Sequence, residues 1–276
     1  MIVQHNMTAL NANRQLGITN TNLARSTEKL SSGYRVNRAA DDAAGLSISE
    51  KMRRHIRGLE QASTNAEDGQ SLIQTAEGAL SEIHSVLQRM RELTVQASND
   101  TNVSADRKAI AKEVRALTSE INRIATQTQF NTMGLLSGGF KNKKLQVGAN
   151  TNQTISITIS SMTAGKLGVS ATVIAKVISS STGKEITKLI TTVNTAITKV
   201  STQRSALGAL QNRLDHTIAN ADNMAENLQS SESKIRDVDM ADEMVSYSAS
   251  SILQQAGQSM LAQANQATQG VLSLLQ

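Results

Sequence analysis

The side chains best suited to proton transfer or metal binding are the four histidines, His5, His55, His84 and His216. None of them stands in a His-Glu-x-x-His pair, the spacing that places two imidazoles on one helix face around zinc. The chain also lacks a glycine-rich phosphate loop and the sharp turn that presents a nucleophilic serine. We therefore expect no enzyme activity, no cofactor and no metal site, and we interpret His55 as a packing residue.

A second group of residues that could take part in specific interactions is a cluster of opposite charges that follows Gly33. The cluster, called the spoke below, contains Arg35, Arg38, Asp41 and Asp42. Gly33 is suited to end a helix in the left-handed conformation, and an aspartate can cap the helix that follows. The spoke residues are candidates for ion pairs within or between subunits. The alternative that they are only solvated stays open, because exposed pairs contribute about 0–1 kcal/mol.

The elements that position these residues are predicted to be long helices. The 276 residues include no proline and no tryptophan, and 39% are hydrophobic. Without proline, helices can run unbroken, and small aliphatic side chains suit narrow helix-to-helix seams. The absence of cysteine excludes a disulfide framework. Lys and Arg are interspersed with Asp and Glu despite the net charge of +5, so we expect no nucleic-acid partner.

Neither a cleavable signal peptide nor a membrane span is expected. The amino terminus lacks a basic stretch followed by an apolar one. No window approaches about 18 uninterrupted apolar residues, the length that crosses a bilayer.

One heptad frame runs from Leu46 to Asn99 and predicts a rod about 80 Å long. Its first core position is occupied by Met52, Leu59, Ala66, Ile73, Leu80 and Leu87. A short turn before Ser104 predicts that a second helix, ending near Thr128, folds back as an antiparallel partner. A third helix of similar spacing is predicted from about Glu185 to Ile235.

The pattern between the second and third helices changes to period two. Leu145 and Val147, and then Ile155 and Ile157, alternate with polar residues, which predicts a β-hairpin. Residues 163–183 are small, polar and rich in serine and threonine, and we interpret them as a loop or ribbon region in which Val173, Ile174, Val177 and Ile178 cover the hairpin. Serines and threonines between Thr151 and Thr182 are candidates for O-glycosylation, and an unmodified polar loop is the alternative.

The two ends of the chain carry apolar rows at the seven-residue spacing of supercoiled helices. We predict a polymerisation seam made of Val3, Leu10, Leu16, Leu23, Leu30, Leu253, Met260, Ala267 and Leu274. Two paired helices are too few to hide both rows fully. Neighbouring copies can hide them, and such head-to-tail contacts give an open helical polymer.

The expected fold class is mainly α: an elongated helical bundle with long coiled-coil helices, a small β-hairpin region, and paired N- and C-terminal helices. We assign residues 1–44 and 236–276 to an inner terminal-helix domain, with the spoke at 34–44. Residues 45–235 are assigned to an outer bundle domain, with the hairpin region at about 140–183.

Several long motifs resemble bacterial flagellin. They are KLSSGYRVNRAADDAAGL at 29–46, Phe130-Asn131, ESKIRDVDMA at 232–241, MLAQANQ at 260–266 and GVLSLL at 270–275. The resemblance covers roughly residues 1–160 and 185–276. Larger flagellins insert outer domains where this chain has only about residues 160–185, so the resemblance is to a short form.

The resemblance implies a structural subunit that self-assembles into the flagellar filament used for motility. It further implies export through the flagellar type III system, an extracellular location, and a chaperone on the C-terminal helix. Filament cap and hook-junction proteins are implied partners. The alternatives are a hook-filament junction protein and, from another class, a soluble coiled-coil signalling or scaffold protein.

The segment 87–96 resembles the flagellin surface that Toll-like receptor 5 recognises. Carried over to this sequence, the receptor residues are Arg89, Leu93, Gln96 and Glu113. The heptad frame places Arg89, Leu93 and Gln96 on one outward stripe. We expect the same surface to pack between subunits, so that the receptor recognises only monomers.

Overall fold

The computed structural model describes residues 6–180 and 183–273, except for the side chains of residues 172, 173, 180, 183, 184 and 268–273. Most of the described chain is helical, which confirms the mainly α class. Two compact units form: Met1–Ile56 with Glu226–Gln276, and Arg57–Ala225. The boundaries differ from 44 and 236 because the long helices α2 (Ala43–Ser98) and α6 (Gly183–Arg236) each extend from one unit into the other.

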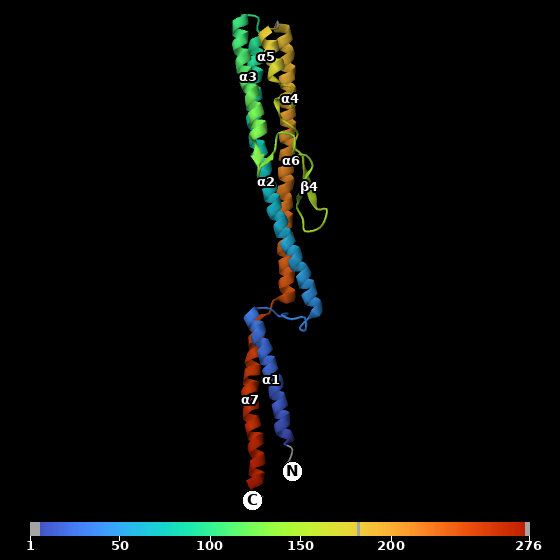
Figure 1. The fold of residues 1–276 in the computed structure, drawn as a ribbon. Coiled ribbons are helices and arrows are strands. Elements are labelled where there is room, and N and C mark those ends of the chain that lie inside the picture. The colour runs from blue at the N-terminus through green and yellow to red at the C-terminus, as the bar shows by residue number, and fades with distance from the viewer. Residues whose placement is uncertain (1–5, 181–182, 274–276) are drawn as a thin grey trace. The chain divides into compact units, whose positions relative to one another are not determined.

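The first unit contains the terminal helices α1 (Met7–Ser32) and α7 (Met240–Ser273), which lie side by side (Figure 1). Asn6 caps α1, because its side-chain oxygen accepts a hydrogen bond from the Ala9 amide at 3.0 Å. Gly33 ends α1 in the predicted left-handed conformation, with φ of 73°.

The second unit is a helical bundle built from α2, α3 (Ser104–Gln127) and α6. Its core contains apolar residues at heptad spacing from all three helices. Fully buried members include Ile73, Leu80, Leu87, Val114, Ile121, Val193, Val200, Leu207 and Leu214. Met52 and His55, predicted as core, are only half-buried, and the neighbouring Ile56 is buried instead.

The predicted β-hairpin is confirmed. Strands β3 (Lys143–Gln146) and β4 (Thr154–Ile157) pair antiparallel with Leu145 opposite Ile155. Ile155 and Ile157 are buried in the core. A shorter pair, β1 (Gln129–Phe130) and β2 (Met133–Gly134), follows α3 directly.

The loop interpretation of residues 163–183 is wrong. This stretch contains α4 (Ala164–Leu167) and α5 (Ala171–Ser180), and α6 begins at Gly183. Ile174 and Ile178, one helical turn apart, are buried, and α5 packs against α3. Burial of this apolar face overrides the weak helix propensity of β-branched residues.

Candidate functional site

The face that joins α1 to α7 is mostly small and polar. The half-buried or buried residues of this face are Ala9, Ala12, Leu16, Thr19, Leu23, Ser26 and Leu30 on α1, and Glu243, Tyr247, Ser250, Gln254, Gly257, Leu261 and Ala264 on α7. The spacing of three and four residues is that of a coiled-coil seam. A Cβ added to Gly257 would lie 3.3 Å from Leu16, so glycine permits close approach there.

Polar contacts join α1 and α7 at three levels along their length. The Asn6 amide donates to the Ala264 carbonyl at 2.9 Å, and Gln254 donates to the Asn20 side chain at 2.8 Å. Lys29 pairs with Glu243 at 3.6 Å. These polar contacts, together with the half-buried leucines of the face, fix the register of the two helices.

The predicted seam divides into two parts. Leu16, Leu23 and Leu30 are half-buried toward α7. Leu10 is 65% exposed, Leu253 and Met260 are each 60% exposed, and Ala267 is exposed. Val3 and Leu274 lie outside the described residues. Of the seven seam residues that the structure describes, four thus stay exposed after the two helices have paired.

Further apolar side chains are exposed on other sides of α1 and α7. They are Met7, Ile18, Met240, Met244, Val245 and Ile252. These side chains lie outside the face through which α1 and α7 pair. The first unit alone supplies packing for only one face of each helix.

The spoke residues Arg38, Asp41 and Asp42 have hydrogen-bonding partners in the structure, and Arg38 also forms an ion pair. Arg38 binds Glu28 at 2.9 Å, and Asp41 accepts the amide protons of Asn37 and Arg38 at 3.2 and 2.9 Å. The amide bonds hold the pKa of Asp41 below its ordinary value, and Glu28 raises the pKa of Arg38. Asp42 accepts the amide proton of Gly45 at 2.8 Å, beside the start of α2.

Arg236 makes several contacts that the sequence did not predict. Its guanidinium lies 4.5 Å from the centroid of the Tyr34 ring and 3.4 Å from Glu50. The Arg35 amide also donates a hydrogen bond to the Arg236 carbonyl at 2.7 Å. The backbones of Tyr34 and Asp237 form an isolated antiparallel β-bridge. The end of α6 and the segment after α1 are thereby tied together. The only available signal was the position of Arg236 inside the flagellin-like motif.

Two of the four residues predicted to contact the receptor form an ion pair with each other. Arg89 on α2 donates twice to Glu113 on α3, at 3.1 and 3.0 Å, and also to Glu92 at 3.0 Å. Hydrogen bonds with Glu92 and Glu113 raise the pKa of the Arg89 guanidinium above its ordinary value. Gln96 is exposed as predicted.

Leu93 is not on the outward stripe, so that prediction is wrong. Its side chain is 2% exposed, while Val95 is the exposed apolar residue of this segment. The inward stripe of α2 here is broad and contains Met90, Leu93, Thr94 and Ala97. Because a bundle helix buries a stripe wider than the two heptad core positions, Leu93 turns inward.

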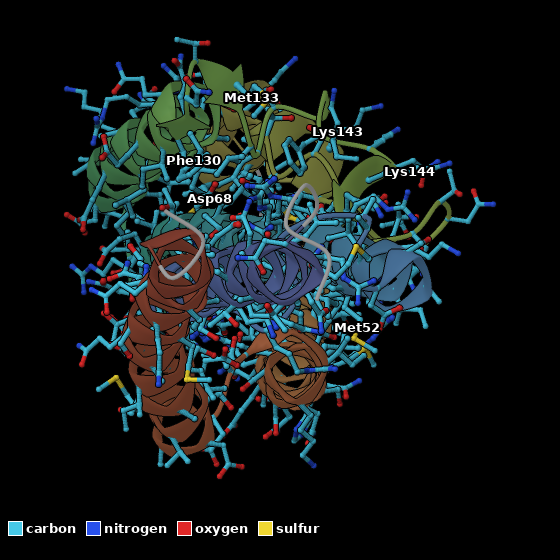
Figure 2. All side chains as sticks on the ribbon, turned by 90° about the horizontal axis from the view of Figure 1, so that it is seen from below. Met52, Asp68, Phe130, Met133, Lys143 and Lys144 are labelled. Atoms are coloured by element: carbon cyan, nitrogen blue, oxygen red, sulfur yellow. The ribbon has the colours of Figure 1, made fainter. Side chains whose placement is uncertain are left out.

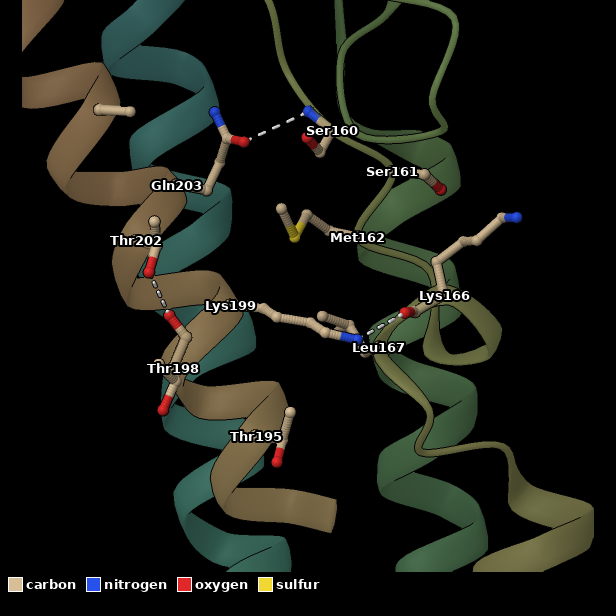
Figure 3. Close-up of a pocket in the computed structure, with 11 residues that line it drawn as sticks. Ser160, Ser161, Met162, Lys166, Leu167, Thr195, Thr198, Lys199, Thr202 and Gln203 are labelled. Atoms are coloured by element: carbon tan, nitrogen blue, oxygen red, sulfur yellow. Dashed lines mark hydrogen bonds between the residues drawn. The ribbon is translucent and has the colours of Figure 1, made fainter. Parts of the chain in front are cut away.

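A hollow of about 460 Å³ lies between α6 and the segment around α4 (Figure 3). Two of its polar side chains form hydrogen bonds with backbone groups. The Gln203 side chain accepts from the Ser160 amide at 3.4 Å, and the Lys199 side chain donates to the Lys166 carbonyl at 3.3 Å. No carboxylate or histidine lines it. The arrangement provides no acid-base pair and is structural.

A second hollow, about 270 Å³, lies under the β3–β4 hairpin. Phe130, Met133, Lys143 and Lys144, labelled in Figure 2, contribute to its wall, and Leu72 and Leu145 are also lining residues. The lining is mainly apolar and carries no reactive group beyond the two lysines and Asp68.

The candidate modification region presents hydroxyl groups outward. Thr154, Ser156 and Thr158 are exposed, in alternation with buried isoleucines. Thr182 and His5 lie outside the described residues. Within residues 6–180 and 183–273, no helix is long and apolar enough to cross a membrane, and no three potential metal ligands group together.

Comparison with known proteins matches both ends of the chain. Residues 3–141 match the bacterial flagellin N-terminal helical region, and residues 190–275 match the C-terminal helical region. A flagellin of Halalkalibacterium halodurans is 52% identical, and the flagellar filament 33 kDa core protein of Treponema phagedenis is 49% identical. Both alignments cover 100% of each chain.

A solved structure shares the fold. It is a putative flagellar hook-associated protein from Vibrio parahaemolyticus, with a TM-score of 0.63 and 13% identity over 71% of this chain and 100% of that one. The two helical-region matches and the full-length identities identify the family. The chain belongs to the bacterial flagellins.

Proposed function

We propose that this chain is the structural subunit that self-assembles into the bacterial flagellar filament, acting through subunit contacts and not by catalysis. The observation that carries the proposal is the seam row of Leu10, Leu253 and Met260, which stays at least 60% exposed after α1 and α7 pair. Burial against sibling copies gains about 25 cal/mol for each Å² of apolar surface. The Treponema relative, named as a filament core protein, supports the same function.

In the polymer, the terminal helices form the inner layer. Residues 1–44 and 236–276 supply this layer, the spoke at 34–44 links it outward, and residues 45–235 form the outer layer. The apolar side chains that α1 and α7 leave exposed support this division, because clusters of such side chains mark surfaces that pack against other proteins.

We propose the following route to the filament. The subunit is exported through the flagellar type III system, and a chaperone covers the C-terminal helix beforehand. Outside the cell, cap and hook-junction proteins meet the growing end. The uncovered side chains of α7 support a chaperone, since exposed apolar surface of this kind favours wrong association.

We also propose that Toll-like receptor 5 recognises the monomer. Arg89, Gln96 and Glu113 form the contact surface, and the buried Leu93 supports it from beneath. The exposed Arg89–Glu113 pair supports this assignment. If cross-linked intact filaments stimulate the receptor as well as monomers do, the surface is not hidden by assembly and the proposal fails.

Assembly is tested by sedimentation and negative-stain imaging of the purified chain. Long polymers are expected, whereas a hook-filament junction protein would fail to grow them alone and a coiled-coil scaffold would stop at a closed dimer or tetramer. Leu253→Asp should prevent growth, because the seam would bury an unpaired charge. Val103→Asp is the matched control, since Val103 is 61% exposed but lies in the second unit.

A further inference from the structure

Methionine supplies a large share of the apolar surface that α1 and α7 leave uncovered. Met7 is 64% exposed and Met260 is 60% exposed, and Met240 and Met244 are each about half exposed. Figure 2 shows sulfur atoms, drawn in yellow, at the outer ends of side chains on α7. Thioethers in these positions are open to oxidants in solution.

Peroxides convert such a thioether to a sulfoxide. The sulfur attacks one peroxide oxygen, the O–O bond breaks and an S–O bond forms; sulfur is oxidised and the peroxide is reduced to water. The product is polar and chiral where the thioether was apolar. Met90 and Met162 are buried in the second unit and are shielded from this reaction.

We propose that Met260, together with Met7, Met240 and Met244, is an oxidation-sensitive modification site that controls whether a free subunit joins the polymer. The inference rests on the proposed function. Met260 lies one heptad after Leu253 and one before Ala267 in the seam row. Assembly would bury its sulfoxide oxygen without a hydrogen-bond partner, which is unfavourable.

The same geometry makes the modification selective for the free subunit. In the polymer, sibling copies cover the seam row, so the Met260 thioether that is open in the monomer becomes inaccessible. Enzymatic reduction of the sulfoxide restores the apolar side chain. Oxidation is therefore a reversible block on addition of new subunits that spares existing polymer.

The experiment treats monomers with hydrogen peroxide, removes it, and follows elongation from preformed seeds. In the test variant Met7, Met240, Met244 and Met260 are replaced by leucine, a volume-conserving change that removes the sulfur. In the matched control variant Met133→Leu and Met224→Leu replace thioethers that are 40% and 43% exposed in the second unit.

Peroxide should slow elongation of the wild type and of the control variant by about tenfold or more, as expected when one unpaired polar group is buried. The test variant should elongate at its untreated rate, and methionine sulfoxide reductase should restore the wild type. Peptide mass spectrometry should find Met260 oxidised and Met90 unchanged in monomers, and Met260 protected in polymer.

Equal inhibition of the test variant, or full elongation of wild type whose Met260 is oxidised, would overturn the inference. Met260→Leu alone gives a second reading if the fourfold variant elongates poorly before treatment; it should lose most of the sensitivity. Failure of untreated wild type to polymerise would instead reject the proposed function. Circular dichroism before and after treatment separates blocked assembly from unfolding.

Discussion

Asp41 organises the turn that leaves α1. Its carboxylate accepts two backbone amide protons, from Asn37 and Arg38, and these bonds require the ionised form. Because the pKa of Asp41 is lowered in the folded chain, the bonds stabilise the turn above the ordinary value of 3.8. That contribution is lost as the pH falls through the lower folded pKa.

We therefore predict that the carboxyl carbon of Asp41 titrates below pH 3.8 in the folded subunit, as followed by NMR. Asp41→Asn should leave the amide of Arg38 less protected from hydrogen exchange, while Asp100→Asn, at the α2–α3 turn, should leave it unchanged. A midpoint at or above the ordinary value would show that the two amide bonds do not persist in solution.

Leu93 and Gln96 should respond differently to truncation. Leu93→Ala removes a fully packed side chain and should lower the free energy of unfolding by about 2–5 kcal/mol. Gln96→Ala, on the exposed side of the same helix, should change it by no more than about 0.5 kcal/mol. Urea unfolding measures both, and receptor assays on Leu93→Ala are interpretable only at temperatures where the variant remains folded.

From the sequence alone, the conformation and exposure of single residues could be predicted better than the partners that their side chains contact. The left-handed conformation of Gly33 followed from the preference of glycine for helix ends, and the exposure of Gln96 followed from the heptad frame. The Tyr34–Arg236 stacking and the Arg38–Glu28 pair depend on how distant segments meet, which no local pattern encodes. Leu93 was misplaced because a strict heptad frame underestimates the width of a buried stripe.

At the scale of elements, the glycines of α2 have different surroundings. A Cβ at Gly58 would lie 2.8 Å from the Cβ of Ala149, and one at Gly69 would lie within the space of Leu145. Nothing lies within 4 Å of a Cβ at Gly78. Gly58 and Gly69 thus let the hairpin approach the helix, whereas Gly78 only weakens it.

Gly78→Ala should therefore stabilise the chain by about 0.5–1 kcal/mol through helix propensity. Gly58→Ala should lose about 1–3 kcal/mol instead, because the hairpin turn must move away. The midpoints of urea unfolding compare the pair directly. Equal stabilisation by both changes would mean that the hairpin does not rest on α2 at Ala149.

The elements themselves were largely predictable. Heptad spacing located α2, α3 and α6, and period-two alternation located β3 and β4. The exception is α5, whose Ile174 and Ile178 are poor helix formers in isolation. Its helix exists because α3 supplies a surface for it, and that surface is far away in sequence.

At the scale of the whole molecule, the two compact units should respond separately to truncation. Deleting residues 253–276 removes much of α7 and four of the nine predicted seam residues, but no residue of the second unit. Polymer growth should be abolished, as judged by sedimentation, while thermal unfolding of the second unit persists in circular dichroism. Loss of both together would contradict the division into two units.

The apolar sides of α1 and α7 also limit how much free chain a cell can store. Each unassembled copy that no chaperone covers exposes leucine, isoleucine, valine and methionine to water, and non-specific association rises with concentration. Synthesis therefore has to keep pace with consumption at the growing end, so that the pool of waiting copies stays small.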